Sequence, residues 1–183
     1  MQRTLVWSGT RPAARANVPA GTRLRHMVES DARAVGTLYF QCLPPDEQDS
    51  LEDAIADVHA ALRGEYGSPF TDGMLVVEAL PDPGTAHGRA GDHATVDVGA
   101  IRAAVLTVNG PPWPDVRDHL FIIDLFTAPD ARRQGLARAL VNTVITHAIH
   151  ALPGRTIGLR VEDTNTAAMS LYTALGFTEH TTR

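Results

Sequence analysis

The stretch from residue 119 to residue 150 places the strongest constraint on how this chain can fold. It opens with an apolar run from His119 to Phe126, whose length and content of Phe, Ile and Leu are typical of a buried strand. Pro129 and Asp130 interrupt this run. Apolar residues then recur at helical spacing on one face, namely Leu136, Leu140, Val141, Val144, Ala148 and Ile149. The pattern therefore predicts a strand, a short loop and a long helix in direct succession.

The loop between the predicted strand and helix has the composition of an anion-binding site. The first N–H groups of a helix lack partners within the helix, and the helix dipole is positive at that end. Gly135 and Ala137 leave the approach to these groups open. Positive charge is added by Arg132, Arg133 and Arg138. A plain strand-to-helix turn with solvated arginines is the alternative interpretation of the same residues.

Two familiar phosphate-binding loops do not fit this stretch. The dinucleotide fingerprint needs three glycines in G-x-G-x-x-G, and only Gly135 is present here. The P-loop needs a lysine, but all 16 basic residues of the chain are arginines. The lack of lysine also excludes Schiff-base chemistry and a lysine general base.

The composition is that of an ordinary globular protein with one domain of 183 residues. The net charge of −5 argues against a general nucleic-acid binder, and no apolar run approaches the ~20 residues of a membrane span. The single Cys42 excludes an internal disulfide and favours a cytoplasmic protein. Cys42 falls on the apolar face of a predicted helix, so we interpret it as a core residue rather than a nucleophile.

The first 25 residues carry five arginines and no acidic residue. They lack the apolar central run of a secretory signal. We expect residues 1–20 to be a flexible leader, within which Thr4–Ser8 could form an extra edge strand. Residues 21–183 would then form the folded domain.

The segment from residue 22 to residue 108 predicts a strand, two helices and a hairpin. Ser30 is the expected N-cap of the first helix, and Ser50 with Asp53 resembles a capping box at the second, which ends at Gly64. The strands are expected at 22–28, 74–80 and 94–108. Acidic residues around the two helices indicate either a solvated face or a field that attracts a cationic amine, and they are Asp46, Glu47, Asp49, Glu52, Asp53 and Asp57.

No metal site is expected from the histidines. His87 and His93 lie in a Pro- and Gly-rich loop without a third ligand at close spacing. His147 and His150 stand three residues apart on the long helix, whereas metal-binding helices of the H-E-x-x-H kind place their histidines four apart.

Two motifs in the second half resemble those of one family. The first is R-x-x-G-x-A at Arg132–Ala137, which follows the strand that ends in L-F-T-x-P. The second is N-x-x-A…L-Y-x-x-L-G-F, from Asn165 to Phe177, which follows a predicted strand at 156–161. Together they resemble the motifs of the GCN5-related N-acetyltransferases (GNAT). Within that family, the motif sequences are most similar to those of the alanine N-acetyltransferases that modify a ribosomal protein.

The resemblance implies an α/β (α+β) fold with a mixed, twisted central sheet that splays at the cofactor slot and has helices on both faces. It implies acetyl-CoA as co-substrate and a primary amine, small molecule or peptide, that attacks the thioester directly in a ternary complex. Tyr172 would act as general acid to the leaving thiolate. The expected cofactor-binding residues are Leu125, Phe126, Thr127, Arg132, Arg133, Gln134, Gly135, Leu136, Ala137, Arg138 and Asn165.

The chain departs from the family pattern at the general base. The nearest subfamily has a glutamate five residues before the asparagine of the second motif, where this chain has Arg160. Asp124 or Glu162 is the expected replacement, and Glu78, His119 and a water relay are further candidates. A non-catalytic acyl-CoA-binding or regulatory module on the same fold is therefore the alternative function, and an unrelated anion-binding domain is a third.

Family members usually continue past the second motif into a further strand. Here only six residues follow Phe177. The last strand is then missing, is replaced by a segment such as Thr4–Ser8, or is supplied by the partner subunit of a homodimer.

Overall fold

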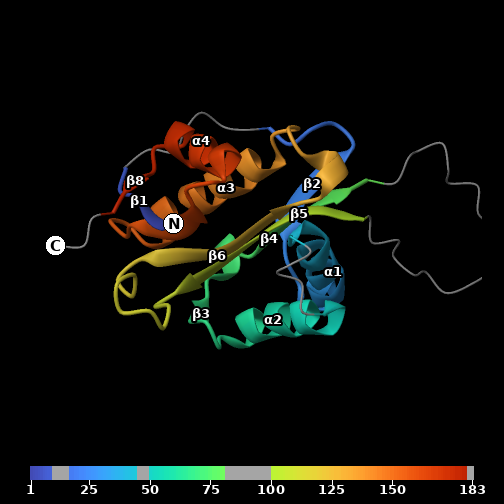
Figure 1. Cartoon of the computed structure of the whole chain (residues 1–183), viewed down its shortest axis with the longest axis horizontal. Coiled ribbons are helices and arrows are strands. Elements are labelled where there is room, and N and C mark those ends of the chain that lie inside the picture. Colours follow the sequence, from blue (N-terminus) through green and yellow to red (C-terminus); the bar gives the residue numbers. More distant parts are fainter. Residues whose placement is uncertain (10–16, 45–49, 81–99, 181–183) are drawn as a thin grey trace, which may run out of the picture.

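The computed structural model describes residues 1–9, 17–44, 50–80 and 100–180. In that part of the chain an eight-stranded sheet has the order β2-β4-β5-β6-β7-β1-β8, and β3 pairs with β5 (Figure 1). The strands are β1 Gln2–Trp7, β2 Thr22–His26, β3 Ser68–Pro69, β4 Leu75–Ala79, β5 Ile101–Asn109, β6 Leu120–Thr127, β7 Ile157–Glu162 and β8 Thr178–Glu179. The helices are α1 Ala32–Cys42, α2 Leu51–Arg63, α3 Leu136–Ala151 and α4 Thr166–Ala174, with short 3₁₀ turns η1 Glu29–Asp31, η2 Thr71–Gly73 and η3 Pro129–Ala131.

The sheet is mixed and is covered by helices on both faces. Every neighbouring pair of strands is antiparallel except β6 and β7, which are parallel and are connected through α3. Helices α1 and α2 lie on one face, and α3 and α4 lie on the other (Figure 1). This arrangement confirms the fold class that the sequence predicted.

The ends of the helices follow their local sequences, with one correction. The Ser50 hydroxyl accepts a hydrogen bond from the Asp53 backbone N–H at 3.0 Å, and Gly64 ends α2 with a φ of 84°, as expected. The prediction that Ser30 caps the first helix was wrong. Ser30 lies inside η1, and Asp31 instead precedes α1 and accepts from the Val28 N–H.

The ladder between β6 and β7 is short. It runs from Leu120 and Ile157 to Ile122 and Leu159, and then the two strands diverge. At the same level a register shift in the β5–β6 ladder leaves Ile123 without an opposite residue. Such a bulge bends the strand and increases its twist, so the sheet opens between the carboxyl ends of β6 and β7.

The segment Gln2–Trp7 is a strand of this sheet. β1 pairs with β7 along all six of its residues, and β8 pairs with its other side through Leu5 and Val6. The sequence offered an extra edge strand at Thr4–Ser8 only as the alternative to a flexible leader. The strand in the structure is Gln2–Trp7, and it lies between two strands and not at an edge. Its position beside β7 matches the possibility that an N-terminal segment takes the place of the last strand, so this edge of β7 needs no strand from a partner subunit.

Some sequence predictions concern residues outside the described ranges. These are the acidic residues Asp46, Glu47 and Asp49, the loop at 81–93 with His87 and His93, and the first residues of the strand expected at 94–108.

We expect Leu5→Ala to destabilise the protein strongly. Leu5 is only 3% exposed and belongs to the main core, so its truncation leaves a cavity, which costs roughly 2–5 kcal/mol of unfolding free energy. Urea denaturation measures this loss. Gln2→Ala, at an exposed position of the same strand, is the matched control and should change stability by less than about 0.5 kcal/mol. Equal stability of the two variants would mean that the first residues are a detachable leader.

Candidate functional site

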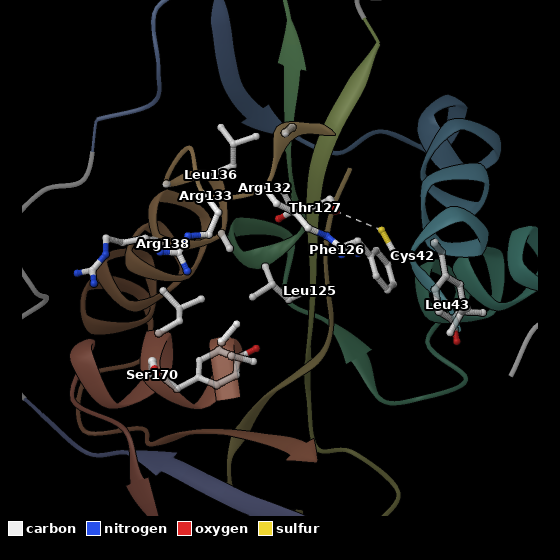
Figure 2. A pocket seen from close by; sticks show the side chains of 18 residues that line it. Cys42, Leu43, Leu125, Phe126, Thr127, Arg132, Arg133, Leu136, Arg138 and Ser170 are labelled. Atoms are coloured by element: carbon white, nitrogen blue, oxygen red, sulfur yellow. Dashed lines mark hydrogen bonds between the residues drawn. The ribbon is translucent and has the colours of Figure 1, made fainter. Parts of the chain in front are cut away.

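A pocket of about 580 Å³ lies where β6 and β7 separate. Figure 2 shows Arg133 and Arg138 on one side of the pocket, with Cys42 and Leu43 on the opposite side. The lining comes from the end of β6, the loop before α3, the first turn of α3, the end of α1 and one face of α4. Its residues are Tyr39, Cys42, Leu43, Leu125, Phe126, Thr127, Ala131, Arg132, Arg133, Gly135, Leu136, Ala137, Arg138, Ala167, Ala168, Ser170, Leu171 and Tyr172.

The end of β6 forms the floor of the pocket. Leu125, Phe126 and Thr127 pair with β5 on one side, whereas the ladder to β7 has already ended at Ile122. The edge of β6 that faces the pocket therefore offers backbone N–H and C=O groups that β7 does not bond. An extended chain with amide groups can pair with such an edge as another strand would.

The loop before α3 has strained backbone and leaves the helix N-terminus uncapped. Arg133 has a φ of 66° and Gly135 a φ of 84°, and a positive φ is uncommon for a residue other than glycine. Gly135 precedes the first turn of α3, and no side chain caps that turn. The first N–H groups of α3 are thus available to an anion, beside the positive charges of Arg132 and Arg138.

Two of the predicted cofactor residues do not line the pocket. The Gln134 amide donates to the Asp130 backbone carbonyl at 3.3 Å on the exposed side of the loop. The Asn165 side chain caps α4, where its Oδ1 accepts from the Ala168 N–H at 3.1 Å. The other nine predicted residues all contribute to the lining.

Tyr172 enters the pocket from α4. The residue is only 6% exposed, and its ring packs against Phe177 with ring centroids 5.6 Å apart. Its hydroxyl makes no hydrogen bond to the residues that the structure describes. Burial, with a further contribution from the charge of Asp124, raises the pKa of Tyr172 above its ordinary value. The phenol is therefore a neutral hydrogen-bond donor throughout the physiological pH range.

Asp124 is a half-buried carboxyl group of β6, next to Leu125 in the chain. No ion pair or hydrogen bond joins its side chain to another residue of the described ranges. Burial raises the pKa of Asp124 to about 7, and the nearby charge of Asp57 contributes to the shift. Its chain neighbour Leu125 lines the pocket. A carboxyl group that titrates near neutral pH has the pKa required of a general base.

The other candidate bases are engaged elsewhere. Glu162 lies 3.3 Å from the N-terminal ammonium group of Met1 and is exposed. Burial acts to raise the pKa of Glu78, but hydrogen bonds from Arg25 and Arg23 lower it overall. Neither carboxylate lines the pocket, and Asp124 does not line it either, although its chain neighbour Leu125 does.

The side chains of His119 and Arg160 also contact residues outside the pocket. His119 lies at the opposite end of β6, where its Nδ1 is 2.5 Å from the Thr156 hydroxyl. Burial lowers the pKa of His119, and the neighbouring His180 adds to this effect. Arg160 forms an ion pair with Asp115 at 2.7 Å and lies 5.2 Å from the ring centroid of Trp113.

The wall formed by α1 was not identified from the sequence. Tyr39 stacks on Phe126 with ring centroids 4.6 Å apart. The Cys42 thiol donates to the Thr127 carbonyl at 3.3 Å, and burial raises the pKa of Cys42, which does not favour a thiolate nucleophile. The spacing of these residues in the sequence indicated the apolar face of a helix. Such spacing does not show which part of the face packs in the core and which part lines a pocket.

A family model describes the same region of the chain. Residues 55–177 match the model of the Acetyltransferase (GNAT) family, and this match covers more than half of the chain. The chain belongs to this family. Its fold, with β6 and β7 splayed at the pocket, agrees with that assignment.

Two curated proteins are similar to parts of the chain. Mycothiol acetyltransferase from Geodermatophilus obscurus is 37% identical over 125 residues, which are 66% of this chain and 38% of that protein. The [ribosomal protein bS18]-alanine N-acetyltransferase from Escherichia coli K12 is 41% identical over 71 residues, which are 37% of this chain and 45% of that protein. The chain thus spans less than half the length of these relatives.

A solved structure shows the same fold across most of its length. It is the yncA protein from Salmonella typhimurium, which was determined with its cofactor acetyl-CoA. The TM-score is 0.56 at 17% identity, over 86% of this chain and 80% of that one. Among the described residues, no helix is both long and apolar enough to cross a membrane.

We expect Asp124→Asn to raise the melting temperature at pH 8 and to change it little at pH 4. The pKa of Asp124 is about 7 in the folded protein against 3.8 ordinarily, so the folded protein binds this proton more tightly than the unfolded chain. The contribution of protonated Asp124 to the free energy of unfolding is fully present below about pH 4 and is lost as the pH rises through 7. Asparagine carries no charge, so the melting temperature at pH 8 should rise by about 2–4 °C for each kcal/mol that ionisation of Asp124 costs the folded protein.

Thermal melts at the two pH values measure the effect. Asp130→Asn is the matched control, because Asp130 is exposed and its pKa is lowered by the hydrogen bond from Arg102. An equal gain for Asp124→Asn at both pH values would show that ionisation is not its cause.

Proposed function

We propose that this chain is an acetyl-CoA-dependent N-acetyltransferase that transfers the acetyl group to a primary amine. The observation that carries the proposal is the juxtaposition, in one pocket, of an open strand edge, an uncapped helix N-terminus with arginines, and the Tyr172 side chain. Acetyl transfer is named in both curated relatives, and acetyl-CoA is bound in the yncA structure.

The residues of the pocket fit the parts of acetyl-CoA. The uncapped N-terminus of α3, with Arg132, Arg133 and Arg138, suits the pyrophosphate. The edge of β6 at Leu125 and Thr127, which β7 does not bond, suits the amides of the pantetheine arm. The Thr127 carbonyl already accepts from the Cys42 thiol and would have to accept a second hydrogen bond. The Asn165 carbonyl already caps α4, so only its amide nitrogen would be left to donate to that arm. When bound, the cofactor supplies an acetyl thioester.

Tyr172 would assist the departure of the thiolate. The amine nitrogen forms a bond to the thioester carbonyl carbon, and the bond from that carbon to sulfur then breaks. The ordinary pKa of tyrosine, ~10, already exceeds the ~8.5 of a thiol. Burial raises the pKa of Tyr172 further, so complete proton transfer to sulfur is unfavourable. A hydrogen bond from the neutral phenol to the developing thiolate therefore supplies most of the stabilisation, and a β6 backbone N–H stabilises the oxyanion.

Asp124 would accept the proton that the attacking amine loses, directly or through a water molecule. Its pKa of about 7 lets it exist as a carboxylate at the pH of the cell and still hold a proton effectively. Asp124 also has no competing ion pair within the described ranges, in contrast to Glu78 and Glu162. These contrasts favour Asp124 among the candidate bases.

The acceptor is a primary amine of a small molecule or a peptide. The acids Asp57 and Asp124 are close enough for the charge of Asp57 to raise the pKa of Asp124, so they form a negative region on the α2 side of β6. Such a region attracts an ammonium group before it loses its proton. A panel of peptides with different N-terminal residues, aminoglycosides and polyamines, read out by release of free CoA thiol, would identify the class.

We expect Gly135→Glu to abolish binding of CoA while the fold is retained. A Cβ atom at Gly135 meets no other atom within 4 Å, so a side chain there extends into the space assigned to the phosphates and adds a negative charge. Isothermal calorimetry with CoA measures the loss, which should exceed 10-fold.

Gly154→Glu is the matched control for this substitution. Gly154 has a φ of 82° against 84° for Gly135 and likewise has nothing within 4 Å of an added Cβ. It lies in the turn after α3, away from the pocket, so both variants carry the same backbone strain and the same charge. If the two variants bind CoA equally well, the phosphate site is not at α3.

We expect Tyr172→Phe to lower kcat by about 100-fold or more, the usual scale for a general acid. The substitution keeps the ring that packs against Phe177 and removes only the hydroxyl. Affinity for CoA and the melting temperature should therefore change little. Steady-state kinetics with an acceptor from the panel, together with calorimetry and melting curves, measure these three quantities.

Each pattern of results has a distinct meaning. Normal turnover by Tyr172→Phe would reduce Tyr172 to a packing residue. CoA binding by the wild type, without turnover on any amine in the panel, would favour a non-catalytic acyl-CoA-binding module.

A further inference from the structure

Three potential metal ligands from separate elements meet at the surface, away from the pocket. His26 is the last residue of β2, Asp72 lies in η2 and His147 lies on α3. One ligand atom from each residue lies within 4.8 Å of the other two. His26 Nε2 and Asp72 Oδ1 are 3.6 Å apart. Around a tetrahedral zinc ion with bonds of about 2.05 Å, ligand atoms are separated by roughly 3.4 Å, so only small side-chain movements would be needed.

The hydrogen bond of His147 prepares its ring for coordination. His147 Nδ1 lies 2.6 Å from the Asp72 backbone carbonyl, which can only accept, so Nδ1 carries the proton. In the neutral ring this leaves Nε2 with a free lone pair. Metal-bound histidines in proteins regularly donate their second N–H to a backbone carbonyl or carboxylate, which fixes the tautomer and the ring orientation.

The backbone beneath these side chains is held in place. His26 pairs with Leu75 in the β2–β4 ladder, and the next N–H, of Met27, donates to the Met74 carbonyl at 2.9 Å. In η2 the Gly73 N–H donates to the Phe70 carbonyl at 2.7 Å. An added Cβ on Gly73 would come within 2.8 Å of Thr107, so this turn packs closely on β5. The ligands therefore sit on a rigid base, which lowers the cost of bringing them together.

We propose that His26, Asp72 and His147 bind one divalent transition-metal ion, of which Zn²⁺ fits best. Two imidazole nitrogens and one carboxylate oxygen form a donor set that zinc accepts, and a water molecule completes the tetrahedron. The side chains of His26 and Asp72 are 54% and 51% exposed, so the ion can reach them and that water has room.

The ion would have a structural role. His147 is 11 residues along α3 from Leu136, which is about 16 Å of helix, so the ion is remote from the reacting groups. It would tie β2 and η2 to the far end of α3, whose first turn forms the phosphate site. A ligand that binds only the folded state stabilises that state. The sequence concealed this site because its three ligands come from distant segments, and His147 and His150 alone lack metal-binding spacing.

Calorimetry with ZnCl₂ on the metal-free full chain tests the proposal, and thermal melts with and without ZnCl₂ accompany it. We expect one ion per chain and a melting temperature that rises with zinc. His147→Ala should weaken binding at least 10-fold and remove the thermal shift. His150→Ala, at an exposed position three residues further along α3, is the matched control and should bind as the wild type does.

Asp72→Asn gives a second, independent test. It keeps the backbone carbonyl that holds His147 and replaces only a strong oxygen ligand, so the protein should fold normally and bind zinc at least 10-fold more weakly. Equal zinc affinity in the wild type, His147→Ala and Asp72→Asn would overturn the site, as would a wild type that binds no zinc. None of these measurements needs an acceptor or acetyl-CoA, so they are independent of the proposed function.

Discussion

The early end of the parallel ladder between β6 and β7 is the constraint on which the site depends. After Ile122 and Leu159 the strands diverge, at the level where the bulge at Ile123 twists β6 away. Backbone groups that a continuous sheet would pair are then left at the edge of a pocket. Because a parallel pair needs a crossover, α3 begins just beyond the open end of β6, and its N-terminus meets the same pocket. α4 follows β7 and brings Tyr172 to it from the other side.

Environment, rather than residue type, separates the carboxylates of this protein into different roles. Glu78 is buried between Arg23 and Arg25, which hold it ionised and make it part of the scaffold. Glu162 is exposed and bonded to the N-terminal ammonium group. Asp124 is partly buried without a cationic partner in the described ranges, so its pKa is raised to about 7. Burial without compensation costs stability, and it leaves Asp124, in contrast to Glu78 and Glu162, with a pKa near neutral.

Much of the fold and part of the site could be predicted from the sequence. The strand, loop and helix at residues 119–150 could be predicted because they depend on residues that are close together in the chain. The apolar spacing indicates the strand and the helix, and the glycine between them allows the positive φ of the loop. The same holds for the N-cap of α2 at Ser50. The cap at Ser30 was mistaken because Asp31 bonds Arg25 and the Val28 N–H, a network that extends beyond the local pattern. The α1 wall was missed since a helix face looks the same whether it meets a sheet or a pocket.

The sequence by itself determined the order and type of the elements, the glycine-containing loop before α3 and the family to which the two motifs point. These features depend on interactions between residues that are close together in the chain, so the spacing of residue types in the sequence is enough to predict them. Only the tertiary structure decided that the first strand stands between β7 and β8, that Asp124 lacks a partner in the described part of the chain while Glu78 and Glu162 have theirs, and that His26, Asp72 and His147 converge. Each of these depends on segments far apart in the chain, and burial and charge at such positions exist only after the sheet has brought those segments together.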